Sequence, residues 1–178
     1  MDLVEAIKTR RSIRKFKEDK ISDELLEKII AATIYSPSWK NTQIVRYVAI
    51  EDEIIKKKIA MEYVPDYNQK AILSAPMLLA ITIVKSRSGY ERDGSFSTIK
   101  GNGWEMFDCG IASQTLCLAS HGYGLGTVII GLFDNNAITE ILNVPKEQEL
   151  VTLIAIGYPD EMPVMPKRKV VNDILQYL

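Results

Sequence analysis

The chain has 178 residues, 47% of them hydrophobic and 25% charged, with a formal net charge of −1. A chain of this length normally forms one domain, and the composition is that of a globular rather than a disordered protein. The slightly acidic balance argues against a protein that mainly binds nucleic acid, since such domains are usually basic. No stretch contains the roughly 20 apolar residues that span a bilayer. The acidic first five residues lack the basic start of a secretory leader, so we expect a cytoplasmic protein.

Two helices are expected before residue 37. Asp2 can cap a short helix that runs directly into the basic residues 10–14, and its apolar residues share one face: Leu3, Ala6 and Ile7. Ser22 can cap a stronger helix, because acidic residues follow it and apolar residues then repeat at helical spacing as far as Ser36-Pro37. The first basic run therefore lies at a helix exit.

The middle of the chain predicts a strand, two helices and a second strand. A polar loop at residues 36–43 precedes a run at 44–50 whose β-branched and aromatic content is typical of a strand. Helices are expected over 52–61 and 66–73. The run 77–84 is almost wholly apolar, which indicates a central strand covered on both faces.

Residues 85–103 are charged, contain four glycines and show no usable period. Such a long irregular connection predicts a flexible, lid-like loop, and an exposed disordered loop is the alternative. A long helix rich in small residues is expected over 104–121 and ends at Gly122. Its small side chains would allow close approach of another helix or of a partner subunit.

The last third of the chain predicts a strand over 127–130, a helix capped by Asp134, and an apolar strand over 150–156. From residue 158 the chain contains three prolines and ends in a short amphipathic piece. We therefore expect residues 158–178 to form an extended arm, one that can lie along a partner.

The cysteines and the single histidine do not predict a metal or a catalytic site. Cys109 and Cys117 lie eight residues apart in one expected helix, and a helical rise of about 12 Å is too long for a disulfide. They are interpreted as reduced core thiols. His121 has no carboxylate or nucleophile at a recognisable spacing, so it is interpreted as a helix-end residue.

Three glycines invite a dinucleotide-binding interpretation, which the order of elements excludes. Gly122, Gly124 and Gly126 lie between a predicted helix and a predicted strand. The dinucleotide fingerprint requires the reverse order, a strand followed by glycines and then a helix. A helix cap and a tight turn explain them better.

Two basic clusters lie at opposite ends of the chain, at residues 10–14 and 167–169. A phosphate monoester is a group that could bring both together, because guanidinium groups bind it in a bidentate manner and the Ser12 hydroxyl can donate to it. Solvated surface charge is the alternative for either cluster alone. The polar loop 36–43 adds amides and hydroxyls able to bind a heterocycle edge or a ribityl chain.

Taken together, these features resemble the nitroreductase family of FMN enzymes. The resemblance covers nearly the whole chain, and its motifs occur in family order. They are Arg10-Arg11-Ser12-Ile13-Arg14-Lys15-Phe16, the Ser-Pro-Ser-x-x-Asn-x-Gln loop of residues 36–43, Asn68 ahead of Ser74-Ala75-Pro76, Asp108-Cys109-Gly110-Ile111-Ala112-Ser113-Gln114, the glycines before Gly131, and Lys167-Arg168-Lys169.

The resemblance implies roles for individual residues in an FMN site. It implies a phosphate site at residues 10–12 and 167–169, and a cation beside the flavin pyrimidine edge at Arg14. It also implies that the second subunit contributes residues 37–43 and that the backbone at Ile130-Gly131 approaches flavin N5. The implied cofactor contacts are Arg10, Arg11, Ser12, Arg14, Pro37, Ser38, Trp39, Asn41, Gln43, Asn68, Lys70, Ile130, Gly131, Lys167, Arg168 and Lys169.

The chain departs from the family pattern in three places. Many members follow the glutamine of the loop with Pro-Trp, whereas Gln43 is followed by Ile44-Val45. Trp39 stands where a small residue is common; it could stack near the partner's flavin or narrow the pocket, and a packed loop aromatic is the alternative. The chain also lacks room for the long helical insertion of larger members, which leaves residues 85–103 as the candidate lid.

The resemblance implies a single α+β domain over residues 1–178, a three-layer α/β/α arrangement with a mixed central sheet, in an intertwined homodimer. It implies an FMN-dependent enzyme that passes electrons from NAD(P)H through flavin N5 to a nitroaromatic, a quinone or a similar small acceptor by a ping-pong mechanism. No catalytic side chain is assigned. The alternatives are dehalogenation, flavin remodelling, or a flavin-binding module without turnover.

Overall fold

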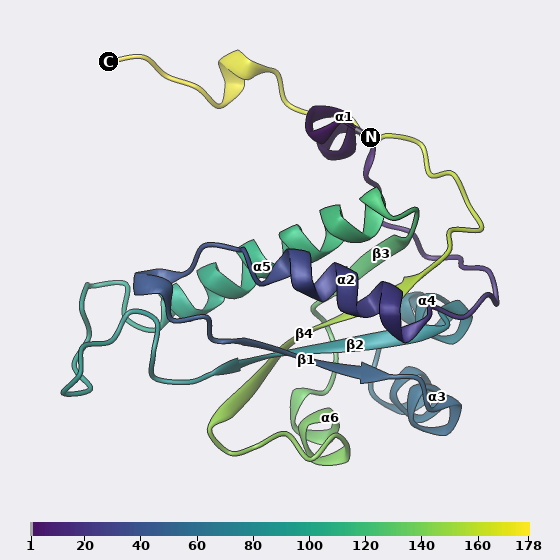
Figure 1. The fold of residues 1–178 in the computed structure, drawn as a ribbon, viewed down its shortest axis with the longest axis horizontal. Helices are drawn as coiled ribbons and strands as arrows, with labels where there is room; N and C mark the ends of the chain where they lie inside the picture. Colours follow the sequence, from purple (N-terminus) through teal and green to yellow (C-terminus); the bar gives the residue numbers. More distant parts are fainter. Residues whose placement is uncertain (1) are drawn as a thin grey trace.

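The computed structural model describes residues 2–178, and it has one four-stranded sheet between two helical layers (Figure 1). The strand order is β1-β2-β4-β3, and every pairing between these strands is antiparallel. Among residues 2–178, parallel pairing is confined to a single bridge between Ser12 and Thr127. The α+β class and the three layers are confirmed, whereas the four strands form an antiparallel sheet instead of the mixed sheet that was expected. The strands are β1 (Val45–Ile50), β2 (Met77–Val84), β3 (Gly126–Ile130) and β4 (Gln148–Gly157).

The helices begin close to the positions that the sequence predicts. Four of the predicted capping side chains accept a backbone N–H of the first turn: Asp2, Ser22, Asp52 and Asp134. Each cap satisfies a donor that the helix itself leaves unpaired. The helices are α1 (Leu3–Thr9), α2 (Asp23–Thr33), α3 (Glu53–Glu62), α4 (Asp66–Ser74), α5 (Gly103–Gly122) and α6 (Asn135–Ile141), with short 3₁₀ turns η1 (Trp39–Asn41) and η2 (Val171–Asp173).

The central strand β2 separates two apolar cores. Its residues Met77, Leu79, Ile81 and Ile83 pack against α2 and α5, whereas Leu78 and Ala80 pack with α3, α4 and α6 on the other face. Successive side chains of a strand point to opposite faces, so a strand that is covered on both faces is almost wholly apolar. The one polar residue of β2, Thr82, is buried and donates to the Gln148 side chain at 2.6 Å. The sequence prediction for this strand is confirmed.

Both cysteines are free and buried in the layer formed by α5, as expected. Burial raises the pKa of the Cys109 thiol to about 11. A thiol that holds its proton this strongly is a poor nucleophile at neutral pH. Cys109 therefore acts as a small apolar core residue.

The two ends of the chain lie outside the helical layers (Figure 1). Helix α1 buries only Ala6, while Leu3 and Ile7, which the sequence places on its apolar face, are exposed. The C-terminal arm, residues 158–178, is extended and exposed over most of its length, with η2 as its one short turn. Within the described residues, none of the helices has the length and apolarity needed to cross a bilayer.

Candidate functional site

The basic run at residues 10–14 lies along the outer edge of β3. The backbone N–H of Ile13 donates to the Thr127 carbonyl at 3.0 Å, beside the bridge between Ser12 and Thr127. Further on, Lys17 N–H donates to the Tyr158 carbonyl at 2.9 Å, so the same segment also pairs with the start of the C-terminal arm. The backbone that carries the basic run is thus hydrogen-bonded to β3 on one side of the run and to the C-terminal arm on the other.

A cavity of about 320 Å³ brings the two basic clusters together. The N-terminal run supplies Arg10, Arg11, Ser12 and Arg14, and the arm supplies Arg168 together with Pro163, Val164 and Pro166. Guanidinium groups and hydroxyls are the donors that bind phosphate oxygens in proteins, so the lining of this cavity has the chemistry to bind a phosphate dianion. Lys167 and Lys169 flank Arg168 on the exposed arm but do not line this cavity.

Two acidic residues at the start of the arm organise the basic run, and sequence reasoning missed both. The Glu161 carboxylate accepts the backbone N–H groups of Arg14 and Lys15. Lys15 forms an ion pair with Asp160, with 2.6 Å between Nζ and Oδ2, which raises the pKa of Lys15 and lowers that of Asp160. Lys15 is therefore committed to an acidic partner, while the neighbouring Arg14 lines the cavity.

His121 lies in the last turn of α5, beside a second cavity of about 420 Å³ that shares Arg10 and Arg11 with the first. Its Nε2 is 2.9 Å from the Thr9 hydroxyl, so it fastens the end of α1 to the end of α5. Burial, and then the charges of Arg10 and Arg11, lower the pKa of His121. The interpretation of His121 as a helix-end residue agrees with this contact.

The loop 36–43 lies at the opposite end of α5 from the basic run (Figure 1). The backbone N–H of Trp39 donates to both carboxylate oxygens of Asp108, at 3.1 and 3.0 Å. Asp108 and His121 are thirteen residues apart on α5, a rise of about 20 Å. Pro37, Ser38 and Gln43 line a pocket of about 100 Å³ that has no residue in common with the basic cavity.

Comparisons with known proteins identify the family of the chain. Residues 7–158 match the model of the Nitroreductase family. This chain belongs to the nitroreductase family. A relative from Methanothermobacter thermautotrophicus, named as a candidate NADH dehydrogenase/NAD(P)H nitroreductase, is 30% identical over 92% of this chain and 80% of its own length. The NADPH-flavin oxidoreductase of Vibrio harveyi is 30% identical over 93% of this chain and 69% of its own length.

Solved structures show the same fold. The nitroreductase family protein of Clostridium novyi NT superposes with a TM-score of 0.78 at 30% identity, covering 90% of this chain and 87% of that one. The four-stranded sheet and its two helical layers are thus the nitroreductase fold, and the sequence resemblance to the family is confirmed.

In this nitroreductase, the residues that the family resemblance implies as FMN contacts lie in separate groups. The basic run and Arg168 share one cavity, whereas Pro37, Ser38 and Gln43 lie at the other end of α5. Asn41 is exposed on that same loop, where its side-chain oxygen accepts from the Gln43 amide at 3.2 Å. The Trp39 ring packs on Trp104 with 4.6 Å between centroids, so it is a packed aromatic within its own subunit.

The remaining implied contacts lie on β3 and α4. The Ile130 side chain is buried in the core, and Gly131 is exposed directly after the strand. Asn68 is 9% exposed on α4, and Lys70 is exposed on the same helix. Neither Asn68 nor Lys70 lines the basic cavity, and their roles stay predictions.

Proposed function

We propose that this nitroreductase is an FMN-dependent oxidoreductase that takes electrons from NAD(P)H and passes them to an electron-poor acceptor, a nitroaromatic or a quinone, in a ping-pong cycle. The observation that supports it most directly is the cavity at which Arg10, Arg14 and Arg168 converge from the two ends of the chain. The name of the Vibrio harveyi relative, an NADPH-flavin oxidoreductase, supports the same class of reaction.

The residues at this cavity suit the terminal phosphate of FMN. Guanidinium groups match phosphate oxygens in a bidentate manner, and Ser12 adds a hydroxyl donor. Arg11 donates to the carbonyl groups of Lys8 and Arg10, at 2.7 and 2.8 Å, so part of its guanidinium already caps the end of α1. Arg10 and Arg168 are therefore the strongest candidates for direct phosphate contacts, with Lys167 and Lys169 nearby on the arm.

The bridge between Ser12 and Thr127 joins the phosphate cavity to β3, the strand that ends at the backbone proposed to approach flavin N5. Ile130 is three residues along β3 from Thr127, which is about 10 Å of strand. Ser12 would contact the phosphate end of bound FMN, and the backbone at Ile130-Gly131 would approach its ring. Asn68 and Lys70 are proposed as further polar contacts.

Bound FMN would supply the redox chemistry, because the flavin ring accepts a hydride from NAD(P)H and then passes electrons on. The protein would hold Arg14 against the pyrimidine edge, where a cation stabilises the negative charge that develops on reduction. Glu161 would keep Arg14 in place through its backbone N–H. No side chain is assigned as acid or base.

We also propose that the working molecule is a homodimer with FMN at the subunit interface. Loop 36–43 lies too far along α5 from the basic cavity to complete the site of its own subunit. Pro37, Ser38, Asn41 and Gln43 would instead complete the site of a second copy, and the Trp39 ring, packed on Trp104, would support them from its own subunit. Exposed apolar residues on α1 and on the C-terminal arm support this assembly, among them Leu3, Ile7 and Ile174.

The proposal is tested by an anaerobic titration of the FMN-loaded protein with NADH and with NADPH, followed by visible absorbance. Bleaching of the flavin band by either nucleotide, and its recovery on adding a quinone, is the expected result. A colourless preparation that FMN cannot reconstitute would contradict the cofactor assignment. Flavin that neither nucleotide bleaches would shift the function toward dehalogenation, flavin remodelling or binding alone.

The role of Arg14 has its own test, with the next residue as a matched control. Arg14→Ala should slow flavin reduction by about tenfold, the effect of losing one charge-assisted contact, while FMN affinity falls less. Lys15→Ala removes an equal charge one residue along, and this charge is paired with Asp160 rather than facing the cavity. Stopped-flow reduction rates that fall equally in both variants would contradict the assignment.

A further inference from the structure

The loop 36–43 has an unusual backbone. Three of its residues are not glycine and yet have positive φ: Lys40 at 44°, Asn41 at 56° and Gln43 at 49°. Such conformations cost on the order of 1–3 kcal/mol each and persist only where the surroundings impose them. The side chains of Pro37, Asn41 and Gln43 are nonetheless exposed, so the strained loop adds little to the core.

A buried hydrogen-bond network holds this loop from beneath. Asp108 is 2% exposed, and its carboxylate accepts the Trp39 N–H together with the Ser88 hydroxyl, the latter at 2.6 Å. Ser88 is fully buried, and its hydroxyl is also 2.6 Å from that of Thr42. Asp108 therefore connects both ends of η1 to α5. It accepts directly from Trp39 at the first end, and Ser88 connects it to Thr42 at the other end.

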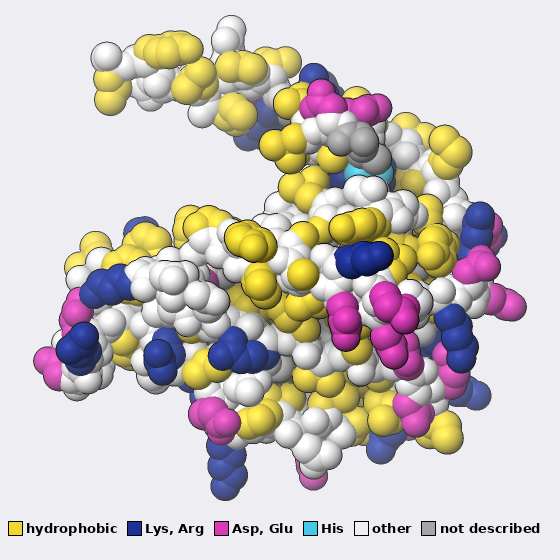
Figure 2. Space-filling model, viewed as in Figure 1, with side chains coloured by type: hydrophobic (Ala, Val, Ile, Leu, Met, Phe, Trp, Pro, Cys, Tyr) yellow, Lys and Arg dark blue, Asp and Glu magenta, His cyan; other side chains and the backbone are white. Residues whose placement is uncertain are grey.

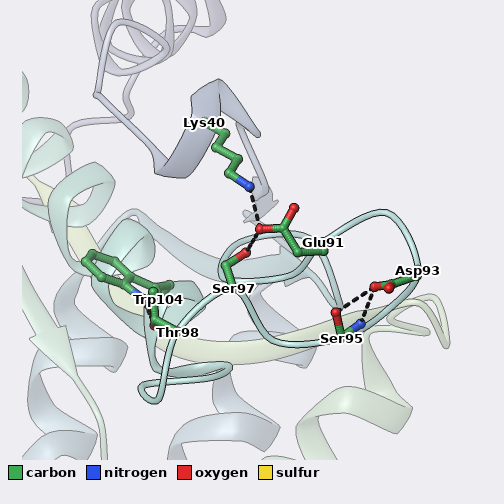
Figure 3. A network of polar contacts seen from close by, with 7 residues as sticks. All are labelled: Lys40, Glu91, Asp93, Ser95, Ser97, Thr98 and Trp104. Atoms are coloured by element: carbon green, nitrogen blue, oxygen red, sulfur yellow. Dashed lines mark hydrogen bonds and ion pairs between the residues drawn. The ribbon is translucent and has the colours of Figure 1, made fainter.

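The segment 85–103 supports the same loop from outside. Figure 3 shows Lys40 reaching from η1 to the Glu91 carboxylate, an ion pair of 2.8 Å, and Ser97 donating to the same oxygen at 2.5 Å. Trp104 packs on Trp39 and is held by a hydrogen bond of 2.8 Å from its indole N–H to Thr98. The segment expected to be a flexible lid is thus bonded to loop 36–43, and its mobility stays a prediction.

A buried carboxylate in the second turn of α5 is not what stability alone would select. Asp is a weak helix former, and burying a carboxylate is unfavourable unless its oxygens are hydrogen-bonded. Here the Asp108 carboxylate accepts from Trp39 in loop 36–43 and from Ser88, which itself contacts that loop. The carboxylate is therefore used to fix the loop.

We propose that Asp108 is a positioning residue, which holds loop 36–43 in the strained conformation that presents Ser38, Asn41 and Gln43 to the flavin of a second copy. The inference rests on the proposed function, because it assigns to the loop the ring and ribityl portion of FMN. The phosphate stays with Arg10 and Arg168. Loss of Asp108 should thus weaken binding of the flavin portion and leave the phosphate contacts intact.

The test measures the binding of two probes, FMN and riboflavin, which lacks the phosphate, to the full-length protein. Asp108→Ala should weaken both by the same factor, about tenfold for the loss of hydrogen bonds to a charged group. Arg168→Ala should weaken FMN alone. Asp108→Asn keeps a carbonyl oxygen that can accept from Trp39 and Ser88, so it should recover most of the affinity for both probes.

The loop itself can be observed without flavin, because Trp39 and Trp104 are the only tryptophans of the chain. Two indoles at 4.6 Å should give an exciton couplet in far-ultraviolet circular dichroism. Asp108→Ala should lose the couplet and Asp108→Asn should keep it. Glu105→Gln is the matched control: Glu105 is equally buried on α5, but it accepts from Arg87 instead of loop 36–43.

The outcomes separate this inference from the proposed function. Wild-type protein that binds neither probe would overturn both. A folded Asp108→Ala protein that keeps either the couplet or its riboflavin affinity would overturn the positioning role alone. If the Ala variant does not fold, Ser88→Ala decides, because Ser88 links Asp108 to Thr42. Ser88→Ala should reduce both the couplet and the riboflavin affinity, and unchanged values in this variant would reject the role.

Discussion

Neighbouring side chains of the basic run have different environments, although the sequence makes them look alike. Arg14 lines the cavity, Lys15 pairs with Asp160, and Arg11 donates to the end of α1. The presence of an anion site at residues 10–14 follows from residue type. Whether Arg14 or Lys15 faces the cavity depends on Asp160 and Glu161, nearly 150 residues later, and no local pattern contains that information.

His121 predicts how the stability of the folded protein depends on pH. Its pKa is lowered in the folded protein, so the unfolded chain binds a proton at a pH where the folded protein does not. The free energy of unfolding should therefore fall as the pH decreases through about 6.5, the ordinary value. Subtracting the profile of His121→Gln, measured by urea denaturation, isolates this contribution.

The same histidine reports on the anion site. FMN phosphate at Arg10 and Arg11 would offset the charges that contribute to the low pKa of His121, so binding should raise that pKa. The chain has one histidine, and its imidazole proton signals can be followed by NMR titration. Identical titration curves with and without FMN would contradict a phosphate site at these arginines.

Individual elements follow the sequence closely where local rules act. The capping residues, the two-sided apolar strand β2 and the small residues of α5 all predict their elements. Helix α1 differs, because its apolar face is exposed instead of buried in its own subunit. Periodicity indicates that a face is apolar and does not identify what covers it.

The start of β3 offers a prediction about an element. A Cβ at Gly126 would lie 2.5 Å from Ile13 Cγ1, so the close approach of the basic run to β3 requires glycine there. Gly126→Ala should reduce the free energy of unfolding by about 1–3 kcal/mol, the range for overpacking. It should also weaken FMN binding, because Ile13 lies between Ser12 and Arg14.

The matched control is Gly122→Ala. A Cβ at Gly122 meets no atom within 4 Å, so this change should leave both stability and FMN affinity close to those of the wild type. Denaturation and fluorescence titration measure the two effects. Equal behaviour of the two variants would show that the contact between Ile13 and β3 does not shape the site.

Across the whole molecule, apolar surface lies on both sides of a hollow between the C-terminal arm and the helical layer (Figure 2). The arm contributes Val170, Val171, Ile174 and Leu175, all exposed. The hydrogen bonds of η2 are internal to the arm. An extended segment with this much exposed apolar surface is typical of a subunit interface.

The arm gives a prediction about assembly. The double variant Val171→Asp with Ile174→Asp should reduce the mass measured by light scattering from twice 20.1 kDa to 20.1 kDa, because charges would replace buried apolar contacts. FMN affinity should fall with it. The double variant Asn172→Asp with Gln176→Glu adds equal charge to polar positions of the same arm and should stay dimeric; a monomeric wild type would reject the homodimer.

The sequence by itself determined the α+β class, the order of the helices and strands, and the family, because caps, periodicity and ordered motifs act through neighbouring residues. It also identified the residue types of an anion site. Tertiary structure decided that Arg168 joins Arg10 and Arg14 at one cavity, that Glu161 fixes the basic run, and that Asp108 and segment 85–103 hold loop 36–43. These contacts join segments far apart along the chain, and only the packing of α5 and β3 brings them within bonding distance.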